Sequence, residues 1–159
     1  SGTQAFTDVV AAFGDDIIGA DGEVDRRSLG GKVFGNPERL KKLTDIVWPA
    51  IMRTAEQEIA SAKAENLNRV VVLEAAVLIE ADWLSLVDQV WVTVVEPSVA
   101  IERASARDGV DAAAVQARID AQLSNDERIA KAHDVIHNSG DQDHLIEQLR
   151  QLWAGISAA

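Results

Sequence analysis

The chain of 159 residues contains no cysteine, which excludes a disulfide framework, a thiolate metal site and a cysteine nucleophile. Histidine is also scarce. The three histidines, His133, His137 and His144, lie close together near one end of the chain, which is too few and too local for a zinc site. We therefore predict no metal ligands in this sequence.

Long apolar runs and an excess of positive charge are missing as well. No run approaches the ~20 apolar residues of a membrane span, and no signal-peptide pattern opens the chain. There are 15 Lys and Arg against 26 Asp and Glu, a net charge of −11, and such an acidic surface is a poor partner for nucleic acid or anionic lipid. We predict a cytoplasmic protein that binds neither nucleic acid nor a membrane. Because the first residue is Ser1 rather than Met, we expect a processed, excised or truncated chain.

The first half of the chain predicts helices. Apolar residues spaced at helical intervals over residues 4–13 end at Gly14, and Asp25 has the position of an N-cap for a second helix. Asn36 before Pro37 starts a third helix. Proline at position 49 is expected to end that helix and to begin a fourth one.

The second half alternates strands with helices. Apolar, β-branched runs at residues 69–73, 89–95 and 134–136 predict strands buried on both faces. Helices are predicted from Pro97 to about Arg107, from a cap at Asp111 to about Leu123, from a cap at Asn125, and after the 138–140 turn to the end of the chain. This order predicts an α/β layer with a parallel sheet. Since three strands are few for such a sheet, we expect the chain to be incomplete at its N-terminus.

A set of segments follows a characteristic order along nearly the whole chain: residues 21–26, 29–37, 43–49 and 73–83, then Arg103, 107–109, 118–122 and 135–140. Taken in order, these segments resemble the dephospho-coenzyme A kinase family. The segment at residues 73–83 has the form seen in the kinase half of bifunctional CoA synthase.

The resemblance implies an α/β fold with a P-loop-kinase-like parallel sheet, a helical substrate domain and a lid. Residues 1–68 would form the helical dephospho-CoA-binding region. Residues 69–159 would hold the remaining core strands, the lid helices at about 97–132 and the C-terminal helix. The family begins with a strand, a P-loop, a helix and an acidic strand, but this chain has no G-x-x-x-x-G-K-[ST] match. We expect that N-terminal part to be missing here, or to be fused to or paired with this chain.

The implied reaction is ATP-dependent phosphorylation of the ribose 3′-hydroxyl of dephospho-CoA, the final step of CoA biosynthesis. Mg²⁺ would accompany ATP and would be held mainly by the missing segment, so we expect the isolated chain to be inactive. The alternative is a non-catalytic module that binds CoA or a nucleotide, or a partner subunit. A different nucleotide kinase would share the lid arginines but would not explain residues 21–49.

Positive charge gathers in two islands, residues 26–42 and residues 103–131. By the resemblance, the first island lies at the dephospho-CoA pocket and the second at the ATP lid. The alternative for both is an ordinary solvated helix face.

The resemblance also assigns individual residues. It places Arg107, Arg118 and Glu74 in the catalytic group, although Glu74 could simply cap a turn and an arginine could pair within its helix. The remaining assignments are dephospho-CoA binding by Asp25, Arg26, Lys32 and Trp48, and ATP binding by Arg103, Arg107, Gln122 and Asn138.

Overall fold

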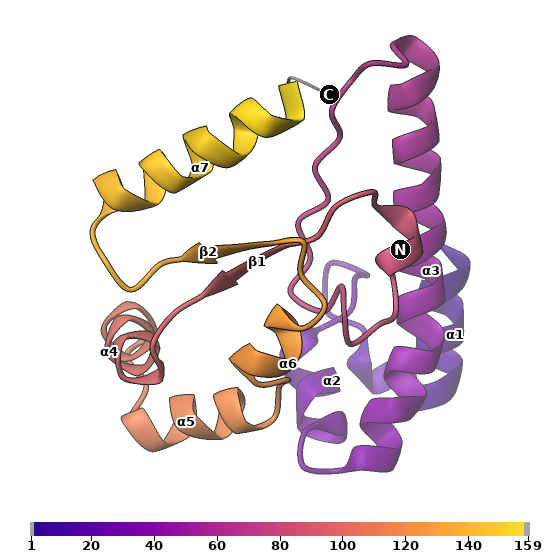
Figure 1. Ribbon diagram of the computed structural model, residues 1–159. Helices are drawn as coiled ribbons and strands as arrows, with labels where there is room; N and C mark the ends of the chain where they lie inside the picture. The colour runs from indigo at the N-terminus through magenta and orange to yellow at the C-terminus, as the bar shows by residue number, and fades with distance from the viewer. Residues whose placement is uncertain (1, 158–159) are drawn as a thin grey trace. The chain divides into compact units, whose positions relative to one another are not determined.

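The computed structural model describes residues 2–157, and the chain divides into two compact units that meet in the sequence between Glu74 and Ala75. The first unit is helical and the second is mixed α/β (Figure 1). No helix among residues 2–157 is both long and apolar enough to cross a membrane.

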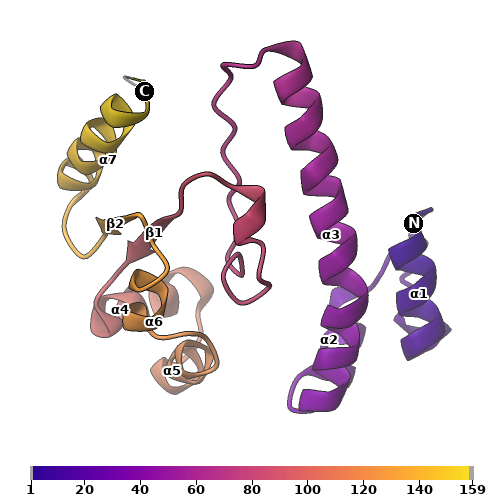
Figure 2. The same ribbon diagram turned by 45° about the vertical axis from the view of Figure 1, so that its right-hand side comes forward.

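The first unit consists of three helices: α1 (Gln4–Phe13), α2 (Arg26–Val33) and α3 (Pro37–Glu65). Both short helices pack against α3 (Figure 2). The predicted caps are confirmed: Asp25 accepts hydrogen bonds from the first turn of α2, Asn36 accepts one from Arg39 N, and Gly14 ends α1 with a positive φ of 95°. A short 3₁₀ helix, Asp15–Ile17, follows Gly14.

The core of the first unit gathers residues from all these elements. Its buried members are Val9, Phe13, Ile17 and Val33. Leu43, Ile46 and Val47 of α3 pack against this cluster. The apolar stripe predicted for residues 4–13 therefore faces α3, and burying it holds the three helices together.

The predicted break at Pro49 is wrong, because α3 is one helix of 29 residues that runs through this proline. Proline lacks the N–H that would donate to the carbonyl of Asp45, so the helix loses one backbone hydrogen bond there. Long helical segments on both sides and the packing of Ile46 and Val47 on the core outweigh that local cost.

The strand predicted at residues 69–73 is also wrong for this structure. Residues 70–74 have no regular secondary structure, and no described segment pairs with them as a strand (Figure 1). Val70 is 43% exposed and Val72 is 75% exposed, so the run is not buried on both faces. A β-branched run favours extended backbone, but a strand also needs a hydrogen-bonded neighbour.

The second unit contains a parallel pair of strands, β1 (Trp91–Val94) and β2 (Asp134–His137), with Trp91 opposite Asp134. β1 lies within the strand predicted at residues 89–95, and β2 extends the strand predicted at residues 134–136 by one residue. The predicted parallel sheet is confirmed. Three helices connect the strands: α4 (Pro97–Asp108), α5 (Ala112–Asp120) and α6 (Asn125–Ile129). A 3₁₀ helix, Leu84–Leu86, precedes β1, and α7 (Gln142–Ser157) follows β2. Val90, Val92 and Val94 form the core of this unit.

One cap of the second unit differs from the prediction. Ser124, not Asn125, is the N-cap of α6, and it forms a capping box with Glu127. The hydrogen bond from Ser124 lowers the pKa of the Glu127 carboxyl. Asn125 is thereby released from capping, and its side-chain amide donates to the carbonyl of Val95 at 3.1 Å.

Candidate functional site

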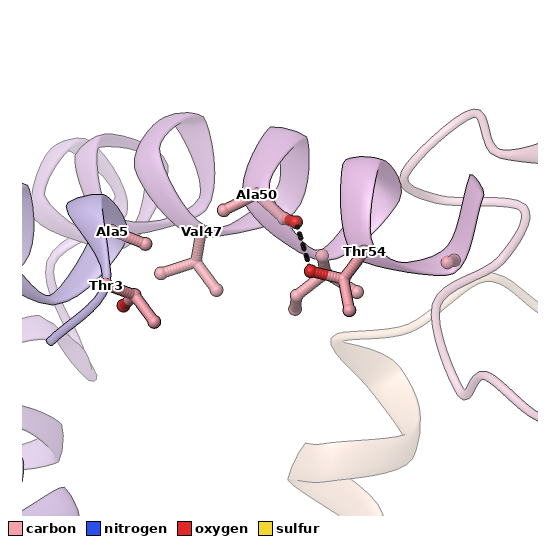
Figure 3. A pocket seen from close by; sticks show the side chains of 7 residues that line it. Thr3, Ala5, Val47, Ala50 and Thr54 are labelled. Atoms are coloured by element: carbon pink, nitrogen blue, oxygen red, sulfur yellow. Dashed lines mark hydrogen bonds between the residues drawn. The ribbon is translucent and has the colours of Figure 1, made fainter. Parts of the chain in front are cut away.

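In the first unit, Arg26 and Trp48 line one groove of about 440 Å³ between α1, α2 and α3. Apart from Arg26 and Glu23, its walls are mostly apolar, with Phe6 and Leu29 among them. A second hollow of about 410 Å³ shares Thr3, Ala5 and Val47 with the groove and continues along α3 (Figure 3). Two residues predicted to bind dephospho-CoA are therefore brought together on one surface.

Arg26 is placed by the N-cap that precedes it. Asp25 Oδ1 accepts from Arg27 N at 2.8 Å and from Ser28 N at 3.2 Å, and its Oδ2 accepts from Ser28 Oγ at 2.8 Å. The Ser28 hydroxyl, followed by the two backbone N–H groups, holds the pKa of the Asp25 carboxyl below its usual value. The carboxylate is thus used to fix the first turn of α2, from which Arg26 projects to line the groove.

Lys32 has a different environment from Arg26. Its Nζ donates to the carbonyl of Phe13 at 2.6 Å and pairs with Asp16 Oδ1 at 2.5 Å. This ammonium group lowers the pKa of Asp16 mainly through its hydrogen bond. Lys32 therefore joins α2 to the end of α1, and it does not line the groove that contains Arg26.

In the second unit, Arg107 and Arg118 converge on one carboxylate. Arg107 binds Asp108 with two hydrogen bonds, Nε to Oδ1 at 2.7 Å and Nη2 to Oδ2 at 3.0 Å. Arg118 Nη1 lies 3.8 Å from Asp108 Oδ2. The guanidinium of Arg107, with a smaller contribution from Arg118, lowers the pKa of Asp108, and the pKa of Arg107 is raised in return. The carboxylate holds α4 and α5 together across the turn at Gly109, which has a left-handed φ of 65°.

Arg103 and Asn138, both predicted to bind ATP, contact each other. Arg103 Nη1 donates to the Asn138 backbone carbonyl at 2.6 Å and more weakly to its Oδ1 at 3.4 Å, while Nη2 donates to the carbonyl of Gly140 at 3.0 Å. These bonds join α4 to the turn after β2. In this structure the end of the Arg103 guanidinium is directed at backbone oxygens of that turn.

Two predicted residues have less structural context. Gln122 is exposed just beyond α5 and donates its backbone N–H to the carbonyl of Ile119. Glu74 is exposed at the end of the irregular segment that closes the first unit. Because residues 69–73 do not form the predicted strand, Glu74 does not lie at the end of a strand in this structure. The functional roles predicted for both residues stay predictions.

Three residues organise the second unit through contacts that the sequence did not predict: Asp108, Asn125, which was expected only as a cap, and Arg128, which was counted only as a member of the second basic island. Asp108 directly follows Arg107, so an adjacent carboxylate was the available signal. Asn125 and Arg128 are three residues apart, the spacing at which helical side chains meet, and Arg128 Nη2 donates to Asn125 Oδ1 at 3.0 Å. No cluster of three or more potential metal-ligating side chains occurs in the described part of the chain.

Comparison with known proteins identifies the family. A model of the dephospho-CoA kinase family matches residues 1–144, about nine-tenths of the sequence. The chain belongs to the dephospho-CoA kinase family. A Geobacter sulfurreducens dephospho-CoA kinase is 37% identical over 153 residues, covering 96% of this chain and 77% of that protein. A Cutibacterium acnes dephospho-CoA kinase is 35% identical over 158 residues, covering 99% of this chain and 68% of the relative.

Solved structures agree with the fold. A crystal structure from Thermus thermophilus matches with a TM-score of 0.74 and 28% identity, over 94% of this chain and 75% of that one. Dephospho-CoA kinase from Campylobacter jejuni matches with a TM-score of 0.62 over 92% of this chain and 75% of its own, and at 22% identity it supports the fold alone. The predicted family and the P-loop-kinase-like α/β fold are confirmed, and dephospho-CoA kinases are phosphotransferases.

Proposed function

We propose that this member of the dephospho-CoA kinase family phosphorylates the ribose 3′-hydroxyl of dephospho-CoA with ATP, the final step of CoA biosynthesis. The observation that carries the proposal is the convergence of Arg107 and Arg118 on Asp108 at the turn between α4 and α5. Phosphoryl transfer is catalysed chiefly by positioning and by neutralising charge on the phosphoryl oxygens. Two guanidinium groups held side by side supply that charge.

Arg107 and Arg118 are suited to act on a moving substrate because both remain accessible. Their side chains are 77% and 62% exposed, whereas the Asp108 carboxyl between them is 31% exposed. An incoming triphosphate can therefore share or replace Asp108 as the partner of both arginines. This exchange is the step by which we propose that the α4–α5 hairpin acts as a lid on ATP.

The groove with Arg26 and Trp48 is the proposed dephospho-CoA site. Dephospho-CoA joins a pyrophosphate to a long, weakly polar arm, so its site requires a cation beside an extended apolar surface. Arg26 meets the first requirement, and the apolar walls along α1 and α3 meet the second. Asp25 contributes by fixing the turn that carries Arg26, and Trp48 contributes one wall. Lys32 contributes by holding α2 to the end of α1.

Arg103, Asn138 and Gln122 complete the proposed ATP site, with Arg103 shaping the turn that contains Asn138. Glu74 is the proposed acidic residue near the reacting groups. Because the described residues offer no cluster of metal ligands, we assign no Mg²⁺ ligand here and propose that the cation arrives with ATP. We also propose a cytoplasmic location and no nucleic-acid or membrane partner, consistent with the net charge of −11.

The sequence contains no G-x-x-x-x-G-K-[ST] motif, so a further part of the proposal concerns completeness. A P-loop supplies backbone N–H groups and a lysine for the β- and γ-phosphates of ATP. We propose that these 159 residues need a P-loop segment, fused or paired, for turnover. The purified chain alone should then form no CoA from ATP and dephospho-CoA.

The test compares the 159-residue chain with the product of the complete coding sequence, each assayed for CoA formation by mass spectrometry. CoA formation by the complete product and none by the chain alone supports both parts of the proposal. Turnover by the chain alone at the rate of an intact relative would remove the requirement for a P-loop segment. Binding of dephospho-CoA without turnover by the complete product would favour a non-catalytic binding module instead.

A further inference from the structure

Hydrogen bonds from several segments assemble the carboxyl edge of the β1–β2 sheet. Asn125 at the start of α6 donates its side-chain amide to the carbonyl of Val95, directly after β1. Glu96 N donates to Ser139 Oγ at 2.9 Å, which joins the end of β1 to the turn after β2. Ligands of open parallel sheets bind outside this edge. The side chains gathered here are therefore candidates for contact with a substrate.

Arg128 is held at this edge by Asn125. Its Nη2 donates to Asn125 Oδ1 at 3.0 Å, so the guanidinium is connected through the Asn125 amide to the backbone at the end of β1. The side chain is half-buried. A guanidinium tethered in this way has little freedom to turn toward solvent, which reduces the entropy lost when it binds a ligand.

Arg128 also has hydrogen-bonding capacity that the described residues leave unused. Its Nε is buried and has no hydrogen-bond partner among them, and no carboxylate of the described chain lies within salt-bridge distance of this side chain. Arg107 and Arg118 differ, because Asp108 balances both of them.

An arginine stays charged at any physiological pH, so the unbalanced charge cannot be removed by losing a proton. Partly burying a charge without a partner costs free energy, and a buried N–H without an acceptor adds to that cost. A phosphate oxygen could bind Nη1, which has no hydrogen-bond partner among the described residues and is not buried, and would balance the charge, whereas the enclosed Nε is not open to a ligand. The geometry therefore points to an anionic oxygen ligand for Arg128.

We propose that Arg128, tethered by Asn125, binds a phosphate group of ATP at the carboxyl edge of the sheet. The choice of ATP rests on the proposed function, because the Asn138 turn assigned to ATP is joined to the same edge through Ser139. The lack of a carboxylate partner for Arg128 among the described residues and its tether to Asn125 are independent of that assignment.

The first experiment measures binding and does not depend on turnover. The dissociation constants of ATP and of tripolyphosphate are determined by calorimetry for the wild-type protein, Arg128→Ala, Arg128→Lys, Asn125→Ala and Arg150→Ala. Arg150 is the matched control, because it is an exposed arginine of the same unit that pairs with Glu147 on α7. We expect Arg128→Ala to weaken both ligands by at least tenfold and Arg150→Ala to leave them unchanged. Unchanged binding by Arg128→Ala, or no binding by the wild type, overturns the proposal.

The variants separate a ligand contact from a structural role. Arg128→Lys keeps the charge but loses the fork, so it should recover part of the affinity, and Asn125→Ala keeps the fork but loses its tether, so it should weaken binding several-fold. If Arg128→Ala does not fold, these two variants still decide, and wild-type affinity in both of them overturns the proposal. A variant that melts earlier but binds ATP normally assigns Arg128 a structural role and also overturns it.

The second experiment separates this proposal from the proposed function. In the product of the complete coding sequence, Arg128→Ala should raise KM for ATP about tenfold and leave KM for dephospho-CoA unchanged. A rise confined to dephospho-CoA would overturn the assignment to ATP. If the wild type binds ATP but forms no CoA, the proposed function fails while the binding result for Arg128 stands. If CoA forms and Arg128→Ala binds ATP normally, only the assignment of Arg128 fails.

Discussion

The two units of the chain use their positive charges differently. In the first unit, the lysines of the basic island at residues 26–42 make the structural contacts. Lys32 bonds to Phe13 and Asp16, Lys41 pairs with Asp45 at 2.6 Å, and Lys42 Nζ lies 5.9 Å from the centre of the Phe13 ring. The arginines of the same island form no ion pair with the described residues and donate no side-chain hydrogen bond to them; they are Arg26, Arg27 and Arg39.

In the second unit, by contrast, arginine side chains form the hydrogen bonds and ion pairs. Arg103 bonds to the turn after β2, Arg107 and Arg118 share Asp108, and Arg128 bonds to Asn125. A guanidinium presents several donors in a rigid plane, so one carboxylate or a pair of carbonyl oxygens fixes its orientation. The difference suits the proposed ligands, since a transferring phosphoryl group requires cations fixed in advance, whereas a long flexible substrate is served by a cation that can adapt.

The largest effect is expected when an arginine that pairs with a carboxylate is removed. In protein that contains the proposed P-loop segment, Arg107→Ala should lower kcat/KM by roughly 100-fold, because a preorganised electrostatic donor acts mainly on the transition state. Steady-state kinetics with both substrates measures the effect, and Arg150→Ala is the control. Unchanged kinetics would return Arg107 to the role of a solvated surface residue.

Removing Arg26, which has no ion-pair partner among the described residues, should have a smaller effect that is confined to one of the two substrates. We expect Arg26→Ala to raise KM for dephospho-CoA about tenfold, the size of one hydrogen bond to a charged group, and to leave KM for ATP nearly unchanged. Arg27→Ala is the matched control, because Arg27 is its neighbour in α2 but does not line the groove. The opposite selectivity would show that the two substrate sites are exchanged.

A third variant keeps Arg107 and Arg118 and removes the carboxylate charge that they share. Asp108→Asn keeps the size of the side chain but removes its charge, so Arg107 and Arg118 lose their shared partner. We expect kcat to fall several-fold, less than for Arg107→Ala, because the charges remain and only their geometry is disturbed. An increase in kcat would show instead that the geometry imposed by Asp108 is not needed and that the need to release the arginines from it slows the reaction.

The smallest effect is expected at the cap that positions Arg26. Asp25→Ala should lower Tm by about 2–4 °C, the usual result of losing an N-cap in a chain of this size. Because folding lowers the pKa of Asp25, its stabilising contribution is present above the unfolded value near 3.8 and is lost as pH falls through the lower folded value. The Tm difference from wild type should therefore be constant above about pH 5 and shrink below pH 4. A difference that grows in acid would contradict the capping role.

Local signals in the sequence gave the correct elements wherever the cause was itself local. The caps at Asp25, Asn36 and Asp111 each accept hydrogen bonds from backbone N–H groups two or three residues away, so neighbouring sequence decides them. At α6 two adjacent residues could both cap, and the choice of Ser124 depends on Glu127 and on the contact of Asn125 with Val95. That contact spans 30 residues, which no local pattern reports.

In the candidate site, too, features set by neighbouring residues were predicted, and features set by contacts between distant residues were not. Spacing in the sequence placed Arg103 and Arg107 on one helix, and the family resemblance grouped them with Arg118 and Asn138. It did not show that Arg103 would bond to backbone carbonyls 35 and 37 residues away, nor that Asp108 would hold two arginines. The sequence placed Arg128 only within the second basic island; its bond to Asn125 and its lack of a carboxylate partner among the described residues depend on the fold.

The sequence by itself determined most of the helices, the caps at Asp25, Asn36 and Asp111, the two strands that pair, the acidic character and the family, because each depends on residue type, on short spacing or on the order of motifs. Tertiary structure alone decided that α3 continues through Pro49, that residues 69–73 form no strand, and which arginines are balanced by a carboxylate. These outcomes depend on which segments meet in space, because packing can outweigh one missing hydrogen bond, a strand requires a neighbour, and a charge is balanced only by a group that the fold brings within reach.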